Sequence, residues 1–477
     1  MTGYTKRNSQ VRVCQVVFSV ALCIAVLLVT SPCRSDDSAD HQRIHPYPAN
    51  PFYWQYKGEP VLLVGGSVDD NLFQLFNLEQ HLDEIQAAGG NYIRNTMSDR
   101  RDQGFEVYPF KKLASGKYNL DHWNAEYWTR FENMLRCTYQ SNIVVQIEVW
   151  DRFDYSGDHW PPHPYNPSNN VNYNENQTSL ATRYPDHPGQ NQQPFFFTTP
   201  RQQNNQTLLR YQQRFVDKML SLSLKYGHVL YCIDNETSGE EDWATYWEKY
   251  IRRRAKEVGM SVCITEMWDN WNLRARRHRR TLDHPERYDF VDVSQNNHQQ
   301  GQTHWDNFQW VRSYLKKSPR PINTVKTYGA DGNKFGHSNQ DGVERFWRHL
   351  LGGAAAVRFH RPESGLGLSN VAVASLQAAR KLETLIKLWD VEPANYLLSG
   401  RETNEAFLAA APGKAYIVYF TSGGSVNLDL KQATGTFKLH WISVDTGQWA
   451  DKANISGGNE VPVSPPDNGN WVAAIVK

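Results

Sequence analysis

Charged side chains follow several apolar runs of this sequence at the point where each run stops. The run "HVLYCIDNE" ends in Asn235 and Glu236, and "SVCITEMWD" leads to Glu266 and then to Trp268. Carboxylates in such places can transfer protons or attack as nucleophiles, and basic side chains can bind oxygen-rich or anionic groups. The same pattern recurs in four other runs, "VLLVGGSVDD", "NYIRN", "INTVKT" and "AAAVRFHRP", which supply Asp70, Arg94, Lys326, Arg358 and His360.

Runs of this kind predict strands that are buried on both faces, as in a parallel sheet. Helical patterns separate them: "NLEQHLDEIQAAGG" places Leu78, Leu82 and Ile85 on one stripe and ends in a glycine pair. The alternation recurs about eight times, so we predict an α/β fold with a (β/α)8 TIM barrel near residues 45–390. In such barrels the chemistry lies at the carboxyl ends of the strands, where the residues above should meet.

Residues 151–207 interrupt this rhythm with a segment rich in Asn, Gln and Pro. A connection of this length is typical of a functional lid or of disorder. We expect it to cover part of the cleft and to contribute Trp150, Trp160 and Tyr165 to its lining.

The pattern changes after residue 395 to short segments with alternating apolar residues, such as "AYIVYF" and "FKLHWISVDTGQW". This alternation, with Gly and Pro in the turns, predicts an antiparallel β-sandwich over residues 395–477. We interpret it as an accessory domain.

Residues 1–35 have the order of a secretory signal peptide, with basic residues, the apolar run "VVFSVALCIAVLLVTS" and then small residues. The sequence therefore predicts a secreted or periplasmic protein. An uncleaved membrane anchor is the alternative, since the apolar run is almost long enough for a short span.

The composition argues against several partners. The 51 Lys and Arg against 50 Asp and Glu give no sign of nucleic-acid binding. His159, His163 and His187 lack the spacing of zinc ligands, so we expect no metal, and no cofactor motif is present. The sequence makes no prediction of the oligomeric state.

A barrel whose fourth strand ends in Asn235 and Glu236 resembles the clan of retaining (β/α)8 glycoside hydrolases. Arg94 in "YIRN" matches the arginine of that clan on the second strand, and "HWISVDTGQW" resembles the β-sandwich that follows apiosidase-like barrels and is commonly labelled collagen-binding. The resemblance implies a carbohydrate substrate and an acid/base role for Glu236. Asp70, Arg94, Asn235, Trp268, Lys326, Arg358 and His360 would then bind the substrate.

One position departs from the clan's pattern. Clan members carry the nucleophilic Glu at the end of strand seven, where "INTVKT" has Lys326. Glu266 is our candidate for the second catalytic carboxylate, with Trp268 at the sugar site; an ion pair of Glu266 with Lys326 or an arginine is the alternative. Lys326 could bind substrate oxygens or form a Schiff base. Three functions therefore stay open: an exported glycoside hydrolase acting on a polysaccharide or oligosaccharide, a non-catalytic carbohydrate-binding barrel, and a Schiff-base lyase.

Overall fold

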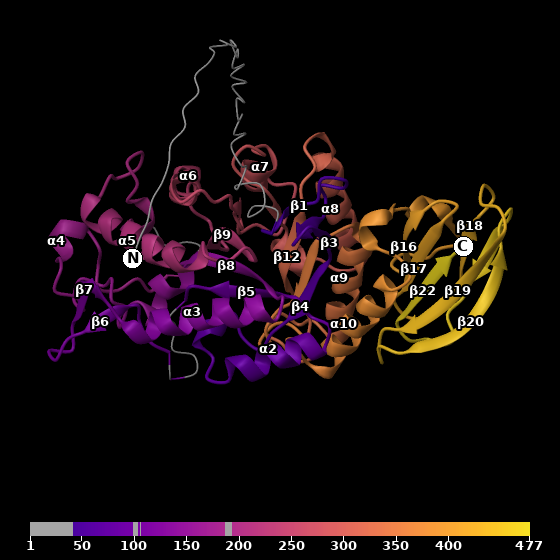
Figure 1. Ribbon diagram of the computed structural model, residues 1–477, viewed down its shortest axis with the longest axis horizontal. Coiled ribbons are helices and arrows are strands. Elements are labelled where there is room, and N and C mark those ends of the chain that lie inside the picture. The colour runs from indigo at the N-terminus through magenta and orange to yellow at the C-terminus, as the bar shows by residue number, and fades with distance from the viewer. Residues whose placement is uncertain (1–41, 99–103, 105, 187–192) are drawn as a thin grey trace, which may run out of the picture.

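The computed structural model describes residues 42–98, 104, 106–186 and 193–477 (Figure 1). The predicted signal peptide and His187 lie outside these residues. Within the described part of the chain, no helix is both long enough and apolar enough to cross a membrane.

Two four-stranded parallel sheets form the centre of the larger part of the molecule. The first has the order β10-β9-β8-β5 and the second β11-β12-β13-β4. The strands are β4 (Leu63–Gly66), β5 (Tyr92–Thr96), β8 (Val144–Asp151), β9 (Val229–Asn235), β10 (Cys263–Thr265), β11 (Val291–Asp292), β12 (Ile322–Thr327) and β13 (Ala356–Phe359).

A helix follows each of these strands and covers the sheets from outside (Figure 1). The apolar stripes of these helices pack on the strands, as the spacing of apolar residues in the sequence predicted. The helices are α2 (Leu78–Ala87), α3 (Ala125–Gln140), α5 (Gln206–Ser223), α6 (Glu241–Glu257), α7 (Arg276–Leu282), α8 (Gly301–Tyr314), α9 (Asn339–Gly352) and α10 (Asn370–Glu383).

A few hydrogen bonds outside any strand ladder link the two sheets at both edges. The backbone N–H of Asn91 donates to the carbonyl of Val64 at 2.8 Å, and that of Asp289 donates to the carbonyl of Ile264 at 2.9 Å. These bonds place β4 near β5 and β10 near β11, so the strands follow one another in chain order, as in a (β/α)8 fold. No strand ladder joins the two sheets in the described residues.

A small antiparallel sheet precedes the first parallel strand, with β1 (His45–Pro46), β2 (Trp54–Tyr56) and β3 (Glu59–Val61). Trp54 is fully buried, and its indole N–H donates to Oδ1 of Asn323 on β12 at 2.9 Å. This sheet therefore closes the amino-terminal side of the parallel strands.

The described residues of the segment after β8 form a compact unit of short helices. It contains the short helices η2 (Arg152–Tyr155), η3 (Gly157–His159), α4 (Glu175–Thr178) and η4 (Pro194–Phe197). Trp150, Trp160 and Tyr165 are all at most 2% exposed and pack in one hydrophobic cluster. The prediction that these three rings line the cleft was wrong, because large aromatic side chains stabilise the segment more by burial than by exposure.

Other short elements connect these parts. They are η1 (Leu72–Gln74), the hairpin β6 (Phe110–Lys112) and β7 (Tyr118–Trp123), η5 (Ser294–His298), η6 (Leu315–Lys317), η7 (Leu388–Asp390) and η8 (Asn395–Leu397).

The carboxyl-terminal part contains two antiparallel sheets, as the alternating pattern predicted. The six-stranded sheet has the order β14-β16-β17-β22-β19-β20, and the three-stranded sheet β15-β18-β21. One hydrophobic cluster lies between them. The strands are β14 (Glu392–Pro393), β15 (Leu398–Ser399), β16 (Ala406–Ala411), β17 (Ala415–Phe420), β18 (Val426–Asp429), β19 (Thr436–Ser443), β20 (Trp449–Ser456), β21 (Glu460–Val463) and β22 (Trp471–Val476).

The six-stranded sheet packs its other face against the helices α8 and α9 (Figure 1). Tyr419 stacks on Trp347 with ring centroids 5.7 Å apart, and Phe407 lies 4.9 Å from Trp305. All four rings are at most 5% exposed, so the two parts share a continuous apolar interface.

Candidate functional site

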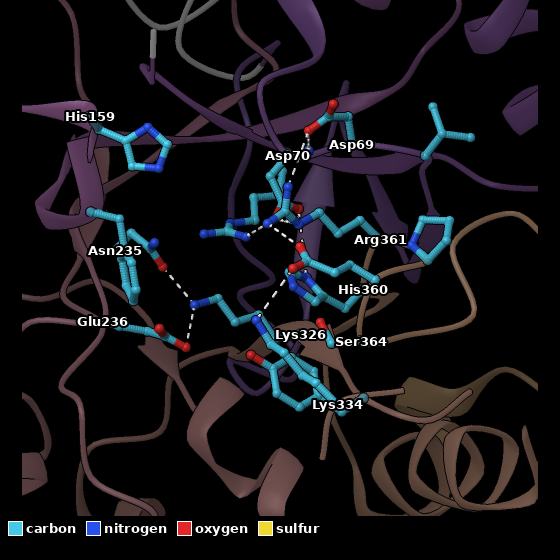
Figure 2. Close-up of a pocket in the computed structure, with 16 residues that line it drawn as sticks. Asp69, Asp70, His159, Asn235, Glu236, Lys326, Lys334, His360, Arg361 and Ser364 are labelled. Atoms are coloured by element: carbon cyan, nitrogen blue, oxygen red, sulfur yellow. Dashed lines mark hydrogen bonds and ion pairs between the residues drawn. The ribbon is translucent and has the colours of Figure 1, made fainter. Parts of the chain in front are cut away.

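A cavity of about 510 Å³ opens at the carboxyl ends of the parallel strands (Figure 2). Most of the residues singled out in the sequence meet there, although they are far apart along the chain. The predicted residues that line it are Asp70, Arg94, Asn235, Glu236, Lys326 and His360. The end-of-strand pattern thus identified one common site.

Glu236 and Lys326 form an ion pair at the floor of this cavity. Glu236 directly follows β9, Lys326 lies on β12, and the ammonium Nζ is 2.6 Å from Oε1 of the carboxylate. Lys326 also donates to Oδ1 of Asn235 at 2.6 Å. Gln295 donates its amide Nε2–H to the same Oε1 of Glu236 at 3.0 Å, so one carboxylate oxygen is held by two donors.

The backbone of Glu236 is in the left-handed region, with a φ of 46°. Few residues with a side chain adopt this conformation, and such strained positions concentrate at functional sites. Here it turns the chain just after β9, and the side chain, 17% exposed, reaches the cavity wall.

The electrostatics keep Glu236 ionised. Burial raises the pKa of its carboxyl, but the attraction and hydrogen bond of Lys326, together with Arg94 and the hydrogen bond of Gln295, outweigh burial, and the net effect lowers the pKa to about 2. At neutral pH the free protein therefore presents an anion here, and a proton donor only under acidic conditions.

Asp70 is the second buried carboxylate of the cavity. Arg94 Nη1 contacts its Oδ2 at 2.7 Å, and Arg358 Nη2 contacts its Oδ1 at 3.0 Å. Burial raises the pKa of Asp70, but these guanidinium groups and His360 hold it well below its ordinary value. Arg94 also pairs with Glu148 at 2.6 Å, so it links two carboxylates.

Arg358 and His360 have different places in this network. Arg358 is fully buried behind Asp70 and donates to the carbonyl of Val325 at 2.8 Å; it does not line the cavity. His360 lines the cavity, and burial lowers its pKa well below the ordinary value, so its ring is neutral at pH 7. The sequence did not distinguish these two positions.

Glu266 and Trp268 do not line the cavity. Glu266 is 1% exposed, and its Oε1 accepts the backbone N–H groups of Asp234 and Met267, both at 2.9 Å. Burial and the neighbouring Asp234 raise the pKa of Glu266 well above its ordinary value. The indole N–H of Trp268 donates to Thr281 at 2.7 Å in the protein interior. The ion pair of Glu266 with Lys326 is not present either.

Several cavity residues were not predicted as site residues. Phe153 and His159 come from the segment after β8, and Lys334 and Arg361 come from loops after β12 and β13. Tyr328 was predictable, because it follows Lys326 by two positions and an extended chain points such residues to the same side.

Each carboxylate that lines the cavity faces a cation. Arg361 approaches Asp69 at 3.9 Å and pairs with Glu363 at 2.6 Å; Lys334 lies 3.4 Å from Glu363. In the described residues, no group of three or more His, Cys, Asp or Glu side chains is arranged to hold a metal ion. These charged side chains can form many charge-assisted hydrogen bonds with a ligand that carries hydroxyl groups.

Comparison with family models and with curated proteins finds no match. Solved structures do match in fold. A glycoside hydrolase family 5 protein from Bacteroides vulgatus is 12% identical with a TM-score of 0.61, covering 92% of this chain and 94% of that chain. Another structure, described as a glycoside hydrolase, is 11% identical with a TM-score of 0.64, covering 92% of this chain and 98% of that chain. The fold of this chain is therefore similar to that of these two structures over most of its length.

Proposed function

We propose that the protein is a glycoside hydrolase that binds a carbohydrate chain in the cavity. The observation that carries this proposal is Glu236 on the cavity wall, next to Asn235 at the carboxyl end of β9. We further propose a closed (β/α)8 barrel over residues 45–390, an accessory sandwich over 395–477, and export directed by residues 1–35. The fold likeness supports the class of protein but not the residues that react.

The lining of the cavity suits a sugar. Carboxylate, ammonium and guanidinium groups can exchange hydrogen bonds with ring hydroxyls, while Tyr328 and Phe153 offer flat faces beside them. A volume of about 510 Å³ is in the range of small-ligand pockets and accommodates a few sugar rings.

Glu236 has to gain a proton before it can protonate a glycosidic oxygen. We propose that the substrate causes this by taking over the hydrogen bonds of Lys326. Burial is the largest influence on Glu236 and it raises the pKa, so diverting the ammonium to a sugar oxygen would let the pKa rise. Protonated Glu236 then delivers its proton to the leaving oxygen as water attacks the anomeric carbon. Asp70, an ionised carboxylate of the cavity, would orient this water and accept the proton that the water loses.

A second function, carbohydrate binding without turnover, is favoured by the same ion pair. By its place in the sequence, Lys326 matches the position at which the clan that this sequence resembles carries its nucleophile. It also stabilises the ionised form of Glu236. The Schiff-base reaction has less support, because the nitrogen of Lys326 donates to both Glu236 and Asn235 and so is engaged as an ammonium.

The test compares wild type with Glu236→Gln on a panel of polysaccharides, oligosaccharides and aryl glycosides. A hydrolase should lose about 10²- to 10⁴-fold in rate on substrates with poor leaving groups while it retains binding. Dinitrophenyl glycosides, whose leaving group needs no proton, should lose much less. Measurable oligosaccharide binding with no turnover between pH 4 and pH 8 would favour the binding function. Trapping of a substrate on Lys326 by borohydride would favour the lyase.

A further inference from the structure

Four aromatic rings form a strip that leads out of the cavity, and we call it the aromatic strip. Tyr328 lines the cavity and stacks on Phe335, with ring centroids 5.0 Å apart and planes 13° apart. His298 lies 5.3 Å from Phe335 and stacks on Trp271 at 4.1 Å. Burial lowers the pKa of His298 to about 4, so its ring is neutral at pH 7.

The outer rings of the strip are open to solvent. Trp271 is 55% exposed and Phe335 is 39% exposed. They lie in the loops after β10 and β12, and His298 ends η5 after β11, so all three come from the same end of the sheets as the cavity. An exposed tryptophan stacked on a second ring is a flat apolar platform that continues the cavity outward.

A dense group of arginines follows Trp271 in the chain, within residues 274–280. We call it the arginine group; its members are Arg274, Arg276, Arg277, Arg279 and Arg280. In the described part of the chain only Arg280 approaches a carboxylate, that of Glu241 at 3.9 Å. Five guanidinium groups in seven positions repel one another, and the carboxylates of Glu241 and Asp283 lie in the same groove.

Two members of the arginine group contact loops at the rim of the site, while Arg274 and Arg279 lie over the rings of Trp310 and Tyr314 on α8. Arg277 donates to the carbonyl of Asp269 at 3.1 Å, in the loop after β10. Arg280 donates to the carbonyl of Gly239 at 3.0 Å, three residues after Glu236. An open groove of about 920 Å³ lies along these arginines.

We propose that the aromatic strip and the arginine group form an extended subsite for an anionic glycan whose end occupies the cavity. This rests on the proposed carbohydrate-binding function of the cavity. The strip suits the apolar faces of successive sugar rings, and guanidinium groups without carboxylate partners suit the carboxylates of uronic acids or sulfate esters. Carboxylates and sulfate esters are recognised in the same way, because each is an oxyanion, planar or tetrahedral, that can accept hydrogen bonds from two N–H donors.

The experiment titrates the full chain with three hexasaccharides and their disaccharides, measured by calorimetry. The probes are a galacturonate series, a sulfated heparin series and a neutral cello-oligosaccharide series. Wild type should bind one anionic hexasaccharide at least 10-fold more tightly than the neutral one, and more tightly than its own disaccharide. The better of the two anionic probes identifies the anion as carboxylate or sulfate.

Two variants test which side chains supply the affinity for the hexasaccharide. Trp271→Ala should weaken hexasaccharide binding about 10-fold, since a stacked ring and its buried area are lost. The triple variant Arg274→Gln, Arg276→Gln and Arg279→Gln should weaken it about 3- to 100-fold, with less effect at high salt. Binding of the disaccharide should change in neither. Phe335→Ala, on the same strip, provides a second variant should Trp271→Ala unfold.

Matched control variants remove an exposed ring and three exposed cations that lie outside the aromatic strip and the arginine group. Phe76→Ala removes a ring that is 92% exposed, and Lys111→Gln, Lys112→Gln and Lys117→Gln remove three exposed cations around the β6–β7 hairpin. Hexasaccharide affinity equal to wild type in Trp271→Ala, or a loss in the arginine variant no larger than in the lysine control, overturns the subsite. Normal disaccharide binding with no gain from chain length also overturns the subsite but leaves the cavity's function standing. No binding of any probe contradicts both.

Discussion

Replacing Lys326 by methionine tests whether the ammonium of Lys326 keeps the carboxylate of Glu236 ionised. Methionine fills much of the same volume but removes the ammonium that lies 2.6 Å from Glu236. The carboxylate then stays buried without its cation. We therefore expect a loss of stability that depends on pH, because the cost arises only while Glu236 is ionised.

The magnitude follows from the pKa of Glu236. It falls from an ordinary value of 4.5 to about 2 in the folded protein. At 1.36 kcal/mol per pKa unit, this shift of about 2.5 units corresponds to about 3 kcal/mol in favour of the ionised form. Because burial is the largest influence and raises the pKa, the variant's Glu236 should titrate above 4.5.

The sign of the pH dependence differs between the two proteins. In wild type the folded pKa is depressed, so the stabilisation is present above the unfolded value of 4.5 and is lost as pH falls toward 2. In Lys326→Met the folded pKa is raised, so stability is highest below 4.5 and declines as pH rises above it. The deficit of the variant should thus grow with pH and reach about 3 kcal/mol or more near pH 7.5.

Urea unfolding at pH 4.5 and pH 7.5 measures this deficit. Lys334→Met is the control, since Lys334 pairs with Glu363 where both side chains are more than half exposed, and it should change stability little at either pH. A Lys326→Met deficit that is equal at the two pH values, or smaller at pH 7.5, would refute the assignment of a buried, ionised Glu236.

Four further outcomes are expected. First, if Glu236 is the proton donor, kcat/KM on oligosaccharides should rise as pH falls from 7 toward 3, because its pKa in the free protein is about 2; a flat profile would exclude that role. Second, Glu266→Gln should change stability by less than about 1 kcal/mol and leave turnover intact, because burial and Asp234 raise the pKa of Glu266 and so favour its neutral form; a 100-fold loss of rate would make it a catalytic carboxylate after all. Third, Trp54→Ala should cost about 3 to 5 kcal/mol in urea unfolding, since it leaves a cavity and removes the donor to Oδ1 of Asn323; a cost below about 1 kcal/mol would contradict the closing role of this ring. Fourth, removing residues 395–477 should give an aggregating protein by light scattering, because Trp347 would lose its apolar cover; a monodisperse product would show that the interface is dispensable.

The fold and the gathering of the site were predictable because they follow from local pattern. Buried parallel strands appear as short apolar runs, and their carboxyl ends meet at one edge, so Asp70, Arg94, Glu236 and Lys326 could be placed together from their positions in the chain. The strand pattern places these residues together even where they are more than 200 residues apart in the sequence.

The orientation of individual side chains was not predictable. β10 covers only Cys263–Thr265, and Glu266 just beyond it turns to accept backbone N–H groups of Asp234 and Met267. The N–H of Met267 is local, but only the tertiary arrangement of β9 beside β10 brings the N–H of Asp234 to Glu266. The aromatic residues after β8, Trp160 among them, were likewise misread, since composition alone does not tell a core ring from a lining ring.

The ion pair of Glu236 and Lys326 decides the protonation state of Glu236. A second carboxylate beside Glu236 would raise its pKa and prepare it to donate a proton, whereas the ammonium lowers it. Turnover then requires the substrate to move the ammonium away from the carboxylate, while binding alone does not. The pKa of Glu236 with an oligosaccharide bound is therefore the quantity that separates the two functions: a rise of several units accompanies hydrolysis, and a value that stays near 2 leaves only recognition.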